Sequence, residues 1–190
     1  MQISTRKIVV AGVLLAVALI LSVTSLGYFP VPNVSAAATI MHVPGIIGAV
    51  LEGPVVGLLI TLVFAIDAYI RFGGLFTGAP GYLPVLILLF PRLLVGVGAW
   101  LAYSALKSVN EYVALIAAAI AGTLTNTVLV VGLALVFYGS IPAFASVPRG
   151  AFVLSVIPQA IFETLLAVIV TVAVVAAWKR LDTRGGKSSV

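Results

Sequence analysis

Long apolar runs, separated by short segments rich in polar residues, Gly or Pro, dominate the chain. The runs are too continuous for barrel strands, whose side chains alternate between lipid and lumen, so they predict helices. A helix rises about 1.5 Å per residue and needs about 20 apolar residues to cross a bilayer. The pattern predicts one compact bundle of six transmembrane helices, at about 8–27, 42–51, 54–70, 82–106, 112–138 and 151–178.

The composition places this bundle in a membrane. Hydrophobic residues make up 63% of the 190 residues and charged residues only 8%, whereas soluble domains carry roughly 25% charged residues. The first apolar run has no small-residue cleavage site, which favours a retained helix over a signal peptide. We therefore expect an all-α integral membrane protein, with a short N-terminus at 1–7 and a basic tail at 179–190.

One stretch departs from the simple pattern. Residues 39–57, TIMHVPGIIGAVLEGPVVG, contain too many Pro and Gly residues for one spanning helix. Glu52-Gly53-Pro54 predicts a tight turn, with Pro54 at the first position of the following helix. Three longer segments, at about 28–38, 71–81 and 139–150, are rich in Gly, Pro and small residues and are expected to be loops.

The distribution of cationic residues predicts the orientation. Six spans place both termini on one side, together with seven Lys and Arg residues: Arg6, Lys7, Lys107, Lys179, Arg180, Arg184 and Lys187. Only Arg71 and Arg149 fall in loops on the other side. The positive-inside rule then makes the termini cytoplasmic and the three long loops external. An elaborated outer face is where a ligand would be received.

Several function classes are excluded or disfavoured. The chain has no Cys and one His, so disulfides, thiolate catalysis and Cys- or His-rich metal sites are excluded, and no cofactor is expected. It has no G-x-x-x-x-G-K-[ST] motif for nucleotide hydrolysis. His42 lies beside a proline at the expected outer boundary, which argues against an intramembrane serine protease. The basic residues form no stripe for nucleic acid. We do not expect an enzyme.

Three polar residues lie deep inside predicted helices, where they are costly unless partnered. Arg92, Asn126 and Glu163 each fall about 15–20 Å from one end of their helix, close to the membrane midplane. One interpretation is a structural Arg92–Glu163 ion pair with Asn126 joining helices. The other is that the three form the floor of a polar cavity open to the outside.

Other residues are candidates for the same cavity. Asp67 and Arg71 fall near the outer end of the third helix, where a lone charge is usually just solvated. His42, Asn33 and Trp100 are weaker candidates, since an interfacial His and a lipid-facing Trp are common. On the first helix, Gly12 and Ala16 form a small-xxx-small pair that would let another helix approach closely.

Four segments, taken together, carry a family resemblance. TIMHVPGIIGAVLEGPVVG, LPVLILLFPRLLVGV, GTLTNTVLVVG and QAIFETLLAVIV resemble, in order and spacing, the substrate-binding S components of energy-coupling factor (ECF) transporters, and most of all the pantothenate-type branch. The resemblance covers residues 8–178. It implies a multi-pass protein of the cell membrane that captures a vitamin outside. It also implies association with a transmembrane T component and two cytoplasmic ATPases, and transport by toppling of the S component.

The resemblance also implies roles for particular residues. The family's Ala-x-x-x-Ala face, which packs on the T component, corresponds to Gly12 and Ala16, with a departure at Gly12. The loop between the first two helices usually lids the pocket, which makes 33–42 the lid and hinge. Arg92 with Asn126 suits pantothenate, an anion with hydroxyl and amide groups, but a free Glu163 carboxylate would repel an anion.

Other substrates and another class of function stay open. Riboflavin would call for aromatic stacking, for which Trp100, Tyr103 and Phe162 are available. Folate or a thiamine precursor are further alternatives. A non-transporting membrane scaffold could use the same helices for assembly, and in that case Arg92, Asn126 and Glu163 would be replaceable by apolar residues.

Overall fold

The computed structural model describes residues 5–24, 26–31 and 37–185. Its main elements are α1 (Thr5–Val23), β1 (Tyr28–Pro30), β2 (Ala37–Thr39), α2 (Val43–Glu52), α3 (Pro54–Phe72), α4 (Tyr82–Pro84), α5 (Phe90–Leu106), α6 (Glu111–Val136) and α7 (Arg149–Gly185). A π-helical segment, Val85–Leu89, joins α4 to α5. One 3₁₀ segment, Gly73–Phe76, follows α3, and two, Tyr138–Ser140 and Pro142–Phe144, follow α6. Each of the six ranges predicted as a transmembrane helix is therefore mostly helical, but the predicted count of six spans is not confirmed.

Among the described residues, five helices are long and apolar enough to cross a membrane: Thr5–Val23, Pro54–Phe76, Tyr82–Leu106, Glu111–Val136 and Arg149–Arg180. The helix predicted at 42–51 forms as α2, but it has only 10 residues. Ten residues rise about 15 Å, half the thickness of the hydrocarbon layer. Eight of these residues are buried, so α2 is a core helix surrounded by the longer ones.

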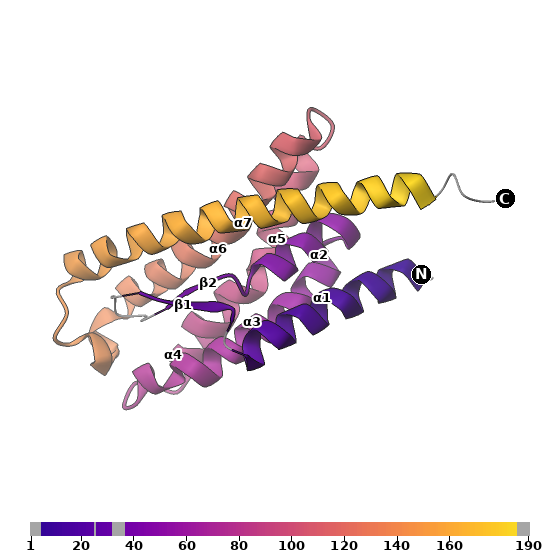
Figure 1. The fold of residues 1–190 in the computed structure, drawn as a ribbon. Coiled ribbons are helices and arrows are strands. Elements are labelled where there is room, and N and C mark those ends of the chain that lie inside the picture. Colours follow the sequence, from indigo (N-terminus) through magenta and orange to yellow (C-terminus); the bar gives the residue numbers. More distant parts are fainter. Residues whose placement is uncertain (1–4, 25, 32–36, 186–190) are drawn as a thin grey trace.

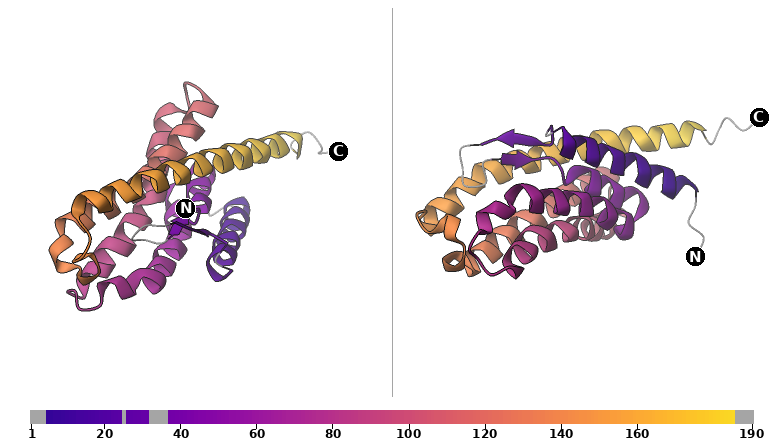
Figure 2. Two further views of the ribbon diagram at one scale, coloured as in Figure 1. Left: turned by 60° about the vertical axis from the view of Figure 1, so that its left-hand side comes forward. Right: turned by 90° about the horizontal axis from the view of Figure 1, so that it is seen from below.

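α1 and α7 extend from left to right in Figure 1, whereas α5 and α6 cross α7 obliquely (Figures 1 and 2) and their connection lies at the top of the view in Figure 1. α1 begins and α7 ends at the same end of the molecule, and the connections after α3 and α6 lie at the opposite end (Figure 1). The short β1–β2 ribbon lies between α7 and the lower helices in Figure 1. Both ends of the described bundle are thus built from segments far apart in sequence.

Small residues let α2, α3 and α5 approach one another at the level of their backbones. A Cβ on Gly57 of α3 would lie 2.5 Å from Ala49 Cβ of α2, and one on Gly96 of α5 would lie 2.7 Å from the carbonyl carbon of Gly57. Small residues at helix contacts are typical of membrane bundles, where close packing drives association. The expected turn also forms: Gly53 has φ of 98° and Pro54 opens α3.

The segment predicted as a loop at 28–38 differs from the expectation at both ends. Tyr28 pairs with Thr39 and Pro30 with Ala37 in a two-stranded antiparallel ribbon. The ribbon is continued by a hydrogen bond from the Ile40 N–H to the Gly27 carbonyl oxygen. These backbone hydrogen bonds hold β1 beside β2, so residues of both strands can line the same site.

Candidate functional site

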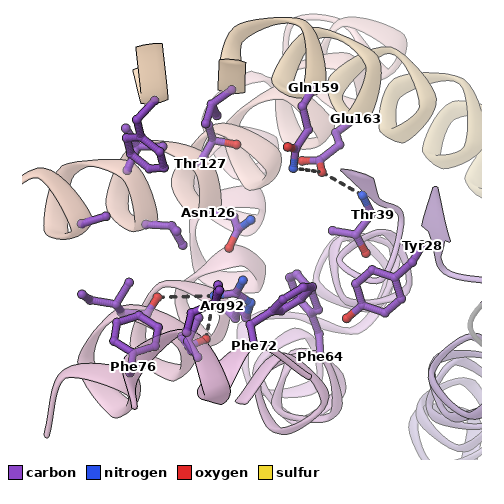
Figure 3. Close-up of a pocket in the computed structure, with 18 of the residues that line it drawn as sticks. Tyr28, Thr39, Phe64, Phe72, Phe76, Arg92, Asn126, Thr127, Gln159 and Glu163 are labelled. Atoms are coloured by element: carbon purple, nitrogen blue, oxygen red, sulfur yellow. Dashed lines mark hydrogen bonds between the residues drawn. The ribbon is translucent and has the colours of Figure 1, made fainter. Parts of the chain in front are cut away.

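A pocket opens among β1, β2, α3, α5, α6 and α7 (Figure 3). About 860 Å³ of space among these elements, with open solvent at the mouth included, is not filled by protein atoms. Its polar lining consists of Tyr28, Thr39, Arg92, Asn126, Thr127, Gln159 and Glu163. Most of the remaining lining is aromatic or aliphatic, including Phe64, Phe72, Phe76, Phe144 and Phe152. The structure therefore brings Arg92, Asn126 and Glu163 to one cavity.

Arg92 lies in the first turn of α5, directly after the π-helical segment. Pro91 has no N–H, so the carbonyl of Ile87, four residues earlier, lacks its usual helical donor. The Arg92 guanidinium turns back and donates from Nη1 to the carbonyl oxygens of Leu88 at 2.8 Å and Ile87 at 3.4 Å. Its Cζ lies 5.1 Å from the centre of the Phe64 ring, a cation–π distance. The cation is fixed in place by the protein.

Asn126 and Thr127 come from the middle of α6. Asn126 is 8% exposed, and its Oδ1 is buried without a hydrogen-bond partner among the described residues. A buried amide oxygen without a partner is costly. Figure 3 shows its side chain pointing into the space between Arg92 and Glu163. A bound molecule with an O–H or N–H group would satisfy it.

Glu163 forms the opposite polar wall, on α7. Its Oε1 accepts hydrogen bonds from Gln159 Nε2 at 2.9 Å, one helical turn away, and from the backbone N–H of Thr39 in β2 at 2.8 Å. The carboxylate is 2% exposed. These contacts tie the β-ribbon to α7 beside the pocket (Figure 3).

The two charged groups of the pocket are held apart. In the part of the chain that the structure describes, Arg92 and Glu163 do not form an ion pair, and each hydrogen-bonds to other groups. The pairing considered from the sequence is therefore not the arrangement in this structure. The pocket offers a cation on one wall and a carboxylate on another.

Asp67 and Arg71 lie outside the lining of this pocket. Arg71 Nε donates to Asp67 at 3.0 Å, and the Asp67 carboxylate also accepts from Ser22 Oγ and from the Tyr28 hydroxyl. Burial, together with the hydrogen bond and charge of Asp67, raises the pKa of Tyr28, so this hydroxyl remains a donor. The pair links α3 to α1 and to β1, and holds in place Tyr28, which does line the pocket.

Of the weaker candidates, neither His42 nor Trp100 lines the pocket. His42, which was expected at the outer boundary of the membrane, is completely buried within the protein, and its Nε2 lies 3.0 Å from Thr123 Oγ1. It packs behind Phe64 at a ring distance of 6.2 Å and does not line the pocket. Trp100 packs against the apolar core around α2. Asn33 lies outside the described residues.

The small pair on α1 lies on an open face. Gly12 and Ala16 are both exposed, and a Cβ on Gly12 would meet no atom within 4 Å. Neighbouring side chains on α1, among them Ile8 and Val13, are also exposed. This chain leaves that face uncovered, so lipid or another helix can cover it.

Sequence reasoning missed Tyr28, Thr39 and Gln159 as pocket residues. Gln159 had a signal, because it precedes Glu163 by four residues and therefore lies on the same face of the helix. Tyr28 and Thr39 had none, since only the pairing of β1 with β2 brings them to α3 and α7. Among the described residues, no cluster of His, Asp and Glu could hold a metal ion.

The sequence and the fold match a known family. Residues 6–175 match the family described as ECF transporter, substrate-specific component. The chain belongs to this family of S components. A relative of this S component in Lactococcus lactis subsp. cremoris (strain MG1363), the pantothenic acid transporter PanT, is 32% identical over 156 residues, which cover 73% of this chain and 76% of the relative.

A solved structure agrees with the architecture of this S component. The structure, of the S component of a bacterial ECF transporter, matches with a TM-score of 0.60 and covers 94% of this chain and 96% of its own. The identity is 22%, so the match shows the fold. This S component is thus a multi-pass membrane protein of a transporter family, and its part in transport is to bind substrate.

Proposed function

We propose that this S component binds pantothenate for an ATP-driven importer of the plasma membrane. The observation that carries the proposal is the pocket itself: a fixed guanidinium, an unpartnered amide oxygen and a carboxylate surround one cavity that is otherwise apolar. Pantothenate combines a carboxylate, an amide, two hydroxyls and a dimethyl carbon. The relative PanT, whose name gives pantothenic acid as its substrate, supports this choice.

Arg92 is the proposed anion site. Guanidinium–carboxylate hydrogen bonds are charge-assisted and stronger than neutral ones. Arg92 Nε is buried without a partner among the described residues, and Nη1 is occupied by backbone carbonyls. A ligand carboxylate at this guanidinium would satisfy a donor that the protein leaves open, and it would do so away from bulk water, where the interaction is strong.

The proposal includes six crossings or partial crossings with both termini in the cytoplasm. The seven-to-two distribution of cationic residues supports this orientation, as does the position of the start of α1 and the end of α7 at one end of the molecule (Figure 1). The pocket then faces outward under the β1–β2 ribbon, which serves as its lid. The energy would come from a T component and two ATPases, with the T component on the face of Gly12 and Ala16.

The experiment that tests the function is direct. The protein is purified and the small molecule released on denaturation is identified by mass spectrometry, and binding of pantothenate is then measured by calorimetry. We expect pantothenate to be retained and Arg92→Ala to weaken its binding by at least about 10-fold, the value of one hydrogen bond to a charged group. Lys107→Ala removes one exposed cation outside the pocket and is the matched control.

Two results would count against the proposal. Retention of riboflavin, folate or a thiamine precursor, with no binding of pantothenate, would replace the substrate. Unchanged affinity in Arg92→Ala would remove Arg92 from the site. If no vitamin bound at all, and apolar replacements of Arg92, Asn126 and Glu163 left cell growth on limiting vitamin unchanged, the protein would be a scaffold.

A further inference from the structure

The polar atoms that the protein leaves unsatisfied around the pocket form an ordered set. Arg92 Nε is a buried donor without a partner, and Asn126 Oδ1 is a buried acceptor without a partner, among the described residues. Both described hydrogen bonds to the Glu163 carboxylate go to Oε1, which leaves Oε2 for a ligand. The pocket therefore has an open donor at Arg92 and open acceptors at Asn126 and Glu163.

Buried polar groups without partners are rare in folded proteins and usually have a cause. Here two such groups, on Arg92 of α5 and Asn126 of α6, line one cavity together with the Glu163 carboxylate of α7. Figure 3 shows Asn126 lying between Arg92 and the Glu163–Gln159 wall. A molecule that satisfies all three must present an acceptor, best an anion, at Arg92 and O–H or N–H donors at Asn126 and Glu163.

We propose that the ligand binds in one orientation, with its carboxylate at Arg92 and its hydroxyl groups at Glu163, so that Glu163 selects ligands that carry a hydroxyl donor. The inference rests on the proposed function. It resolves the apparent conflict of a carboxylate in a site for an anion, because the two negative groups lie at opposite ends of the ligand. A ligand reversed in the pocket would set carboxylate against carboxylate and would give Arg92 only neutral hydroxyl oxygens as acceptors.

Asn126 completes the arrangement at the middle of the ligand. Its amide oxygen can accept from the N–H of the ligand's own amide, which in pantothenate lies between the carboxylate arm and the hydroxyl-bearing end. The apolar lining, which includes Phe72, Phe76 and Phe152, supplies contacts for the dimethyl carbon. A ligand without a matching donor would leave a buried acceptor of the pocket unpaired. The cost of that unpaired acceptor lets the site discriminate strongly against such a ligand.

The test couples protein variants to ligand analogues. Calorimetry compares pantothenate, its alcohol (which lacks the carboxylate) and a deoxy analogue without either hydroxyl, on wild type, Arg92→Gln and Glu163→Met. We expect Glu163→Met to weaken pantothenate binding by about 10- to 150-fold, the range for a hydrogen bond to a charged group. Its effect on the deoxy analogue should be within about threefold, since that partner is already missing.

The alcohol tests the other end. Arg92→Gln should weaken pantothenate binding but change binding of the alcohol by no more than about threefold, whereas Glu163→Met should weaken both. Glu163→Gln retains an acceptor for the hydroxyl and for the Thr39 N–H, and should recover most of the affinity that Glu163→Met loses. That recovery in pantothenate, and not in the deoxy analogue, separates ligand recognition from support of the β-ribbon.

The possible outcomes are decisive. An equal penalty of Glu163→Met on pantothenate and the deoxy analogue overturns the inference, because Glu163 would then act only on the protein. A penalty that disappears with the alcohol overturns it as well, since Glu163 would face the carboxylate end. If the wild-type protein does not bind pantothenate, the proposed function is refuted instead. The inference then requires that the molecule that co-purifies carries both an anionic group and an O–H or N–H donor. A co-purifying molecule that lacks either group refutes the inference.

Discussion

The contact between Gly57 and Gly96 makes a sharp prediction about stability. A Cβ added to Gly96 would lie 2.7, 3.0 and 3.1 Å from the carbonyl carbon, Cα and oxygen of Gly57. Carbon atoms in contact are normally about 3.5–4.0 Å apart, so α3 and α5 would have to separate by roughly 0.8 Å. The obstacle is backbone on both sides, which cannot move aside as a side chain can. Gly96→Ala should therefore destabilise the protein.

The magnitude follows from the same geometry. Overpacking a well-packed core costs about 1–3 kcal/mol, and the better helix propensity of Ala offsets about 1 kcal/mol of this. Gly132→Ala, in α6, is the matched control because a Cβ there meets no atom within 4 Å. Both variants share the propensity gain. The difference between them should therefore equal the steric cost alone, about 1–3 kcal/mol.

The assay is reversible unfolding of purified protein in mixed micelles, with increasing denaturing detergent, followed by the fluorescence of Trp100 and Trp178. We expect Gly96→Ala to unfold at lower denaturant than Gly132→Ala, and to bind ligand more weakly because Gly96 lies one turn from Arg92 on α5. Free energies of unfolding equal within about 0.5 kcal/mol, the limit for independent effects, would show that the helices do not approach as closely as described.

Three further results are expected. Gly12→Leu should abolish co-purification with a T component but leave vitamin affinity unchanged. The control Val128→Leu, at an exposed position on α6, should affect neither. A complex that survives Gly12→Leu contradicts the proposed interface. Tyr28→Phe should speed ligand dissociation about 10-fold, because it removes the hydrogen bond to the Asp67 carboxylate that holds β1 against α3. An unchanged dissociation rate in stopped-flow measurements would exclude β1 from the lid. Trp100→Phe should leave affinity unchanged, since Trp100 does not line the pocket, and a loss of affinity would return it to the site.

The candidate site shows how far single polar residues can be interpreted. Arg92, Asn126 and Glu163 could be found because an ionic or amide group inside an apolar run is expensive, and depth along a helix follows from residue count. Asp67, a candidate near the end of its helix, is satisfied instead by Ser22, Tyr28 and Arg71. Sequence shows that such a group needs a partner. Whether that partner is a side chain or a ligand depends on which helices are neighbours.

His42 illustrates the same limit from the other side. Its neighbour Pro44 suggested a boundary position, but the structure buries the ring behind Phe64 and next to Thr123. The reason is that α2 is a short core helix, and His42, its N-cap, is buried with it. Depth counted along the chain is reliable only for helices that span the bilayer.

The sequence by itself determined the class of protein, the places of the helices and the Glu52-Gly53-Pro54 turn, because these depend on local hydrophobicity and on the backbone limits of Gly and Pro. Only the tertiary structure decided that Arg92 and Glu163 stand apart across a cavity, that Thr39 of β2 reaches Glu163, and that α2 is enclosed by longer helices. These features depend on how side chains from distant segments meet. Such meetings are set by packing between helices, which no local pattern encodes.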